Sequence, residues 1–181
     1  LTLSNYTSTE FLCVSSAPVK LQVVAPGETA VPGSDSGYTG EASTRTAGAP
    51  FVATVNLVDL RWNITTAYAP IVSVDTDDLY DIEPGDLTLT QGTTYFVFTF
   101  IKKSTGTTIT ALSGSYQNGV SRLVPVTFGK PTKLMVLVPG ETALQGSSTG
   151  KTGAPANPFV VNSTFTITVN ACDQYWNVVA D

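Results

Sequence analysis

Apolar and polar side chains alternate along residues 51–58, the period of a β-strand with one face in a core and the other in water. The face that we expect to be buried carries Phe51, Ala53, Val55 and Leu57. No useful length of the chain has the period of an amphipathic helix. The pattern therefore indicates an all-β protein.

Further runs of this kind predict seven strands in one unit, separated by turns that Pro-Gly and Asn-Gly pairs mark. The run at residues 95–101 is apolar on both faces, so we expect it in the middle of a sheet or beneath a neighbouring unit. The strands are expected at residues 20–24, 51–58, 67–74, 87–90, 94–102, 107–112 and 121–128. The expected core contains Phe51, Val55, Leu57, Phe96 or Val97, Ile109 and Val124.

Two blocks of the sequence occur twice. VKLQVVAPGETAVPG at residues 19–33 returns as TKLMVLVPGETALQG at residues 132–146, and FVATVNLVDLRWN at residues 51–63 returns as FTITVNACDQYWN at residues 165–177. The period of 113 to 114 residues is close to the roughly 100 residues of a whole sandwich domain. We therefore expect tandem domains, each with its own core and with matching residues facing inward.

The phase of this repeat divides the chain into three parts. Residues 1–17 match the closing strands of a preceding unit, residues 18–130 make one complete sandwich, and residues 131–181 hold only the opening strands of a following unit. A partial unit leaves an apolar face and strand edges open to water. We expect the partial units to be completed by the rest of a longer chain, or alternatively by strands from a neighbouring subunit.

The motif KLQVVAPGETAVPG, followed by a Gly/Thr-rich loop and FVATVNLVDLRWN, resembles the tandem Ig-like repeats of long bacterial extracellular or cell-surface proteins, of the bacterial Ig-like or invasin type. The resemblance implies tandem immunoglobulin-like antiparallel β-sandwich domains and an extracellular location. It also implies a structural or adhesive function in a fibre, stalk, sheath or adhesin, and it brings no catalytic residues. The expected partners are further copies of the chain or neighbouring Ig-like repeats.

Charge and composition narrow the range of functions. The net charge is −5 with only 9 Lys and Arg residues, which argues against nucleic acids or anionic membranes as partners. The chain has no His, so it lacks the usual general base of Ser-His-Asp triads and imidazole metal sites. No run approaches the roughly 18 apolar residues of a membrane span. We expect a non-enzymatic protein without a cofactor, calcium being the one alternative.

The calcium alternative rests on an acidic cluster, because oxygen-rich loops bind calcium in some sandwich proteins. Its spacing does not match an EF-hand loop, and charged residues at a strand end are ordinarily solvated edge protection. The candidate ligands are Asp75, Asp77, Asp78 and Asp81, with Glu83 and Asp86 nearby.

The pattern Asp-x-x-Trp-Asn ends both copies of the repeat. Trp62 and Trp176 are interpreted as packing plugs at the sandwich end or the joint between domains, with sugar stacking as the alternative. For the matched Asp and Asn residues, hydrogen bonds within a turn are favoured over metal ligation. Glu28 and Glu141, in the Pro-Gly-Glu-Thr turns, are expected at the junction, where they would fix the loop or the interdomain angle.

The two cysteines, Cys13 and Cys172, lie in the flanking partial units, so we expect no bond between them within one chain. An intermolecular disulfide remains open. Cys13 matches Val126 on an apolar stripe, which predicts a buried thiol, whereas Cys172 lies beside a polar stripe and is expected to be more exposed. Asn5, Asn63 and Asn162 begin glycosylation sequons, which matter only in a secreted eukaryotic protein.

Two further classes of function stay in competition with the structural one. One is a binding module for calcium or for a cell-surface or carbohydrate ligand, which an exposed row of aromatic side chains on one sheet would favour. The other is an accessory domain of a large secreted enzyme, which a catalytic domain in the full-length gene would favour.

Overall fold

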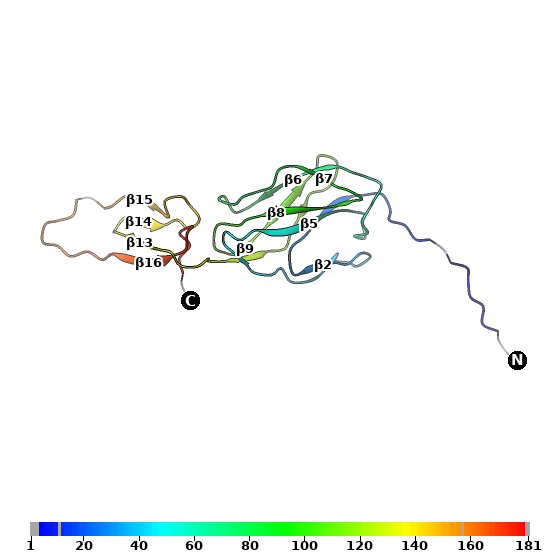
Figure 1. The fold of residues 1–181 in the computed structure, drawn as a ribbon, viewed down its shortest axis with the longest axis horizontal. Coiled ribbons are helices and arrows are strands. Elements are labelled where there is room, and N and C mark those ends of the chain that lie inside the picture. The colour runs from blue at the N-terminus through cyan, green and yellow to red at the C-terminus, as the bar shows by residue number, and fades with distance from the viewer. Residues whose placement is uncertain (1–3, 11, 157, 180–181) are drawn as a thin grey trace.

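The computed structural model describes residues 4–10, 12–156 and 158–179, and every regular element in them is a strand (Figure 1). The described part therefore contains no helix that could span a membrane. The middle unit contains β1 (Lys20–Val24), β2 (Glu28–Ala30), β3 (Tyr38–Gly40), β4 (Arg45–Thr46), β5 (Phe51–Val58), β6 (Ile71–Thr76), β7 (Leu87–Thr88), β8 (Thr93–Phe98), β9 (Ser104–Thr107), β10 (Ile109–Leu112), β11 (Gly119–Val120) and β12 (Val124–Thr127). The C-terminal unit contains β13 (Lys133–Leu137), β14 (Glu141–Ala143), β15 (Lys151–Gly153) and β16 (Thr168–Cys172).

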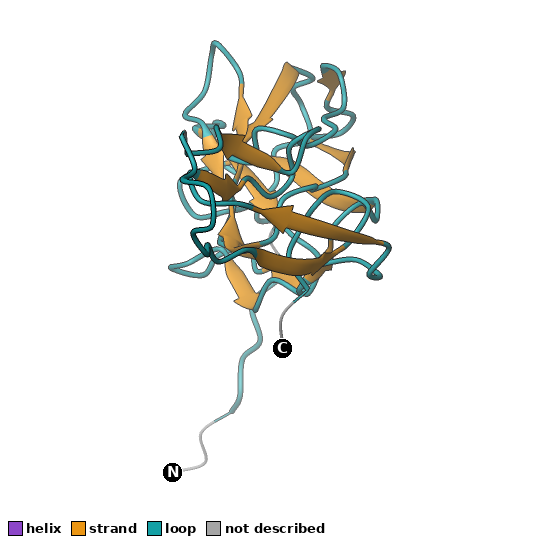
Figure 2. Cartoon of the chain, turned by 90° about the vertical axis from the view of Figure 1, so that its left-hand side faces the viewer, coloured by secondary structure: helices purple, strands orange, loops and turns teal. Residues whose placement is uncertain are grey.

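The sheets of the middle unit enclose one core, and the all-β expectation is confirmed (Figure 2). The sheet orders are β1-β5-β8, β11-β10-β6-β7 and β4-β12-β9, and β2 and β3 form a separate hairpin. The pairings are antiparallel except that of β4 with β12. This arrangement is consistent with a β-sandwich.

The core contains the residues that the alternation predicted. All of the expected positions are buried, with Phe96 rather than Val97 facing inward, since Val97 is half exposed. Phe98 and Phe100 extend the inward set and pack around Phe51, with ring centroids 5.9 and 4.9 Å away. Aromatic pairs at such separations add stabilisation beyond their burial.

The expectation that residues 95–101 lie in the middle of a sheet is wrong. β8 is the edge strand of β1-β5-β8, and the outward side chains of Tyr95 and Val97 are exposed. Val97 pairs with Val52, which is also exposed, so the apolar outer residues form a small surface patch.

The predicted strands at residues 20–24 and 51–58 match β1 and β5. The strand expected from residue 67 begins only at Ile71, directly after Pro70, which has no N–H to donate to a ladder. The hairpin β2–β3 and the short strands β4, β9 and β11 were not expected. They are two to four residues long, too short for a period of two to be visible.

The C-terminal unit repeats the pairing of the middle unit residue by residue. β13 pairs with β16 so that Leu134 faces Ala171, and β1 pairs with β5 so that Leu21 faces Leu57, the same match one repeat earlier. The expected register is confirmed. The apolar face of this pair is open, because these side chains are between 46% and 71% exposed: Leu134, Val136, Phe165, Ile167 and Val169.

The N-terminal segment, described at residues 4–10 and 12–17, runs away from the middle unit without forming a strand (Figure 1). Its side chains Tyr6, Leu12 and Val14 are exposed. That this segment closes a preceding unit stays a prediction.

Candidate functional site

The two Asp-x-x-Trp-Asn loops fold in the same way. Asp59 Oδ1 accepts the N–H groups of Arg61 at 2.8 Å and Asn63 at 3.0 Å. In the second loop, Asp173 accepts the N–H groups two and four positions later at 2.8 and 3.0 Å. Asp side chains stabilise turns through such bonds to their own backbone. The geometry agrees with the turn interpretation of these residues.

The Trp of each loop has a positive φ of 65° and packs inside its own unit. Trp62 lies on the backbone of Gly37, where a Cβ atom would collide with the indole ring, and Trp176 lies in the same way on Gly150. The Nζ of Lys20 lies 3.2 Å from the centroid of the Trp62 ring, and a matching lysine covers Trp176 at 4.2 Å. These contacts use the surfaces that sugar stacking would need, and neither Trp crosses to another unit.

Asn177, by contrast, joins the two units. Its Nδ2 donates to the Ile101 carbonyl at 2.8 Å, and its Oδ1 accepts the Lys103 N–H at 2.7 Å. Nδ2 also donates to Asp173, whose Oδ2 in turn accepts the N–H of Gly129 at 2.8 Å. Asn177 and Asp173 are fully buried, so these bonds are shielded from water. The second loop thus holds the end of the middle unit.

Asp78 holds the same backbone segment from inside the middle unit. Its Oδ2 accepts the N–H groups of Ile101 and Lys102 at 2.7 and 2.8 Å, and its Oδ1 accepts the Tyr80 N–H at 3.1 Å. Residues 101–103 therefore lie between two side chains from different units, Asp78 and Asn177.

The remaining acidic residues do not gather around one point. Asp77 Oδ1 accepts the Thr108 N–H, and Asp81 accepts the Thr76 hydroxyl, which lies next to Asp75. Burial, opposed by the bond from Thr76, raises the pKa of Asp81. Within the described ranges, no group of three acidic or cysteine side chains could hold a metal ion.

Tyr175 is the apolar contact across the joint, and the repeat does not predict it, since the matching residue is Arg61. Tyr175 packs against the core of the middle unit, on the backbone of Gly48, where any side chain would collide with its ring. Gly146 packs in the same manner against Tyr80. Two glycines thus allow two tyrosines to seal the joint.

The exposure predicted for the two cysteines is reversed. Cys172 is buried, because the chain folds back over the end of β16 and forms a bridge with Val178. Cys13 is exposed in the N-terminal segment. Both thiols are free, as expected. Burial, followed by the nearby Asp173 carboxylate, raises the pKa of the Cys172 thiol.

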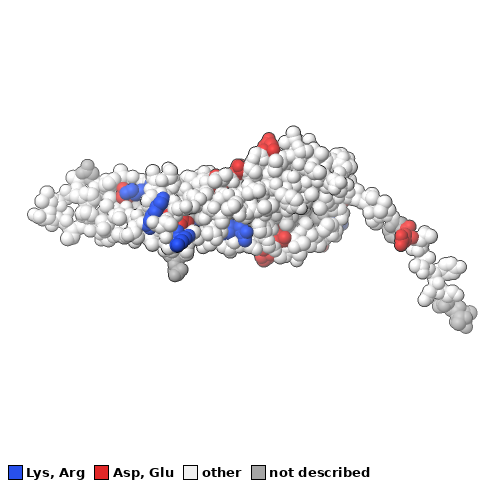
Figure 3. Space-filling view, in the orientation of Figure 1, with Lys and Arg blue, Asp and Glu red and all other residues white. Residues whose placement is uncertain are grey.

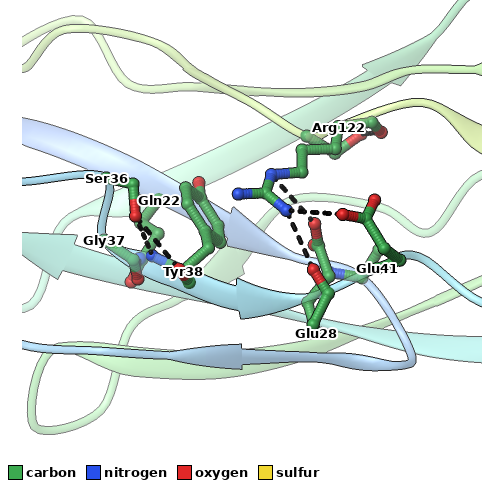
Figure 4. Close-up of polar contacts among 10 residues, drawn as sticks. Gln22, Glu28, Ser36, Gly37, Tyr38, Glu41 and Arg122 are labelled. Carbon is green, nitrogen blue, oxygen red and sulfur yellow. Dashed lines mark hydrogen bonds and ion pairs between the residues drawn. The ribbon is translucent and has the colours of Figure 1, made fainter.

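Glu28 and Glu141 hold their own turns. Glu28 Oε2 accepts the Ala25 N–H at 2.9 Å, and its other oxygen lies 3.6 Å from Nε of Arg122 (Figure 4). Arg122 also lies over Tyr38, whose pKa burial and the Glu28 charge raise to about 12. Glu141 repeats the turn contact at 3.1 Å and pairs with a lysine at 2.8 Å. These contacts fit the loop-fixing alternative and lie inside each unit.

Of the three sequons, Asn5 and Asn162 are exposed, whereas Asn63 is half-buried. The Nδ2 of Asn63 donates to both oxygens of Asp59, at 3.2 and 3.0 Å. A glycan on Asn63 would remove these bonds.

The fold and the joint define a class: β-rich units in tandem, fixed end to end by a buried Asn and a Tyr. Charged side chains are sparse on the face that Figure 3 shows. No protein-family model matches the chain, and no curated protein matches it. Among solved structures, the chain is similar to domains 4–9 of the surface layer protein SbsC, at 20% sequence identity and a TM-score of 0.37. The match covers 93% of this chain and 21% of that chain, so the chain spans about a fifth of that structure's length.

Proposed function

We propose that this chain is a non-catalytic structural segment of an extracellular bacterial surface fibre, stalk, sheath or adhesin. It consists of tandem Ig-like repeats, and its work is to keep successive domains at a fixed angle. The observation that carries the proposal is the clamp on residues 101–103, which Asp78 holds from one unit and Asn177 from the next.

Bending at this joint would break buried bonds. Asn177 uses both its donor and its acceptor on the middle unit, and Gly129 donates to Asp173 from the connecting segment. Each such bond contributes about 0.5–1.5 kcal/mol net, and a buried group left without its partner costs more. The Tyr175 side chain would also leave its place on the core. The joint therefore favours one angle.

The bacterial surface location rests on the resemblance of the repeats described above. An adhesive function would add a ligand to this scaffold. The carbohydrate alternative would be favoured by a row of aromatics, but the described outer face of β1-β5-β8 exposes one aromatic side chain, Tyr95.

The experiment is small-angle X-ray scattering on the full chain and on Asn177→Ala, with Asn118→Ala as the matched control at an exposed site. The native chain and the control should fit one elongated shape. Asn177→Ala should require an ensemble of angles, because the clamp has lost both bonds. A native chain that already requires a broad ensemble would refute the fixed joint.

A further inference from the structure

The joint is encoded twice in the chain but occupied once. Gly129, before the second unit, donates its N–H to Asp173 at 2.8 Å. Ser16, at the matching place before the middle unit, donates its N–H to Asp59 at 3.0 Å. The connecting segment thus meets both loops with the same bond.

We propose that the loop at residues 59–63, together with Gly33, is the docking face for the end of a preceding β-unit of the same repeat type. Asn63 would clamp a backbone segment of that unit as Asn177 clamps residues 101–103. The proposal rests on the proposed function, because it requires that fixed joints recur along the chain.

The docking face already has the shape of the occupied one. Trp62 has the same φ of 65° as its counterpart, and the Asn63 side chain is held by Asp59 in the same way. The Gly33 N–H donates to the Arg61 carbonyl at 2.7 Å, and the matching bond in the second loop is 2.9 Å. A bridge from Val58 to the residue after Asn63 also recurs. The Asn63 amide is therefore oriented as the clamp requires.

What the first loop lacks is the partner. Within the described parts of the chain, Asn63 Oδ1 accepts no hydrogen bond, and the side chain is half-buried where Asn177 is fully buried. A Cβ atom on Gly33 would meet nothing within 4 Å, whereas the matching Gly146 lies against Tyr80. The polar atoms and the space that the preceding unit would use are both open.

The connecting segment identifies the occupant. Residues 8–17 match residues 121–130 of the middle unit, which contain its last strand, β12. The bond from Ser16 to Asp59 brings the end of that segment to this face, where the unit that it closes would be placed. The occupant must offer a carbonyl and an N–H two residues apart, with an aromatic side chain to face Gly33.

One difference predicts how the two joints vary. The position of Tyr175 is taken by Arg61, which is exposed and lies 3.4 Å from Asp35. A guanidinium needs hydrogen-bond acceptors. The end of the preceding unit should therefore offer carbonyl or carboxylate oxygens at the place where the middle unit offers Gly48.

The first test asks whether the sequence of the first loop suffices to form a clamp. Gln174→Leu with Tyr175→Arg makes the second loop identical to the first, DLRWN, in the existing full chain. Hydrogen exchange at the Lys103 amide is the readout, with Asn177→Ala as the reference for an open clamp. We expect the double variant to keep Lys103 about two- to tenfold better protected than the reference, the range that loss of one hydrogen bond gives. Protection that falls to the reference value would overturn the proposal.

The second test supplies the occupant. Residues 18–120 are added in front of Ser8, so that residues 8–17 close the added unit, and Arg61→Tyr fits the loop to that unit's glycine. Exchange at the added copy of Lys103 should be slow and should rise about two- to tenfold in Asn63→Ala. No change in Asn63→Ala, while Asn177→Ala still opens the original joint, would overturn this proposal alone. If neither variant changes its joint, the proposed function fails as well. Dimers of the original chain that Asn63→Ala abolishes would make a second copy the occupant and overturn the proposal.

Discussion

The strand pair β1–β5 and the strand pair β13–β16 have the same register but opposite burial. Val55 is fully buried, and its counterpart Val169 is 53% exposed. Phe51 is 6% exposed and its counterpart Phe165 is 53% exposed. Local pattern is therefore enough to align two strands, whereas burial of their apolar face needs a second sheet, which the middle unit has and the described C-terminal residues do not form.

The largest expected difference is in the response to losing these aromatic side chains. Phe51→Ala should lower the free energy of unfolding by about 3–5 kcal/mol, because it empties a packed site. Phe165→Ala should change it by about 1 kcal/mol or less, as at a surface position. Urea denaturation of both variants measures the difference. Equal losses would mean that the open face is covered in solution, and sedimentation would then reveal an associated species.

The comparison of the acidic residues comes next. Asp78→Ala should destabilise the middle unit by about 2–3 kcal/mol, because three N–H groups lose a charged acceptor. Asp75→Ala, at an exposed site, should stay within about 0.5 kcal/mol. Thermal unfolding compares the two. Addition of calcium supplies a second readout, since a rise in melting temperature that both variants abolish would favour the metal alternative.

A smaller effect is expected from acid. Burial alone would raise the pKa of Asp59, but hydrogen bonds from the Asn63 side chain and from the N–H groups of Ser16, Asn63 and Arg61 lower it to about 2. A pKa lowered by folding stabilises the protein above the usual value of 3.8, and that contribution is lost as pH falls toward 2.

Melting temperatures between pH 5 and pH 2 would test this effect. Asp59→Asn should be less stable than the native chain at pH 5 and should differ less from it near pH 2. Asp35→Asn, on the exposed side of the same loop, is the control. A constant difference between Asp59→Asn and the native chain over this range would contradict the assignment.

The smallest perturbation compares the thiols. At pH 8, Cys13 should react with iodoacetamide quickly and Cys172 slowly, because burial and the nearby Asp173 raise the pKa of Cys172 and restrict access. Mass spectrometry after limited alkylation gives both rates. Equal rates would show that the loop over β16 opens readily, and the joint with it. Cys172→Val restores the residue found at the matching place in β5, and it should leave the joint closed.

The sequence alone predicted the all-β class, the limits of β1 and β5, and the common register of both strand pairs, because these follow from alternation and from a repeated pattern. It also predicted the turn-forming Asp59 and Asp173. It did not predict the hairpin β2–β3, whose strands are too short to show a period.

The joint itself was decided by tertiary structure. Tyr175 could not be found by comparing repeats, because the other copy has Arg61 there. Asp78 was indistinguishable from its acidic neighbours, because spacing does not reveal which carboxylate turns inward to bind backbone N–H groups. The burial of Cys172 depends on chain that folds back from Val178. Each of these properties is set by residues that meet only after folding, and a period along the chain contains no information about such contacts.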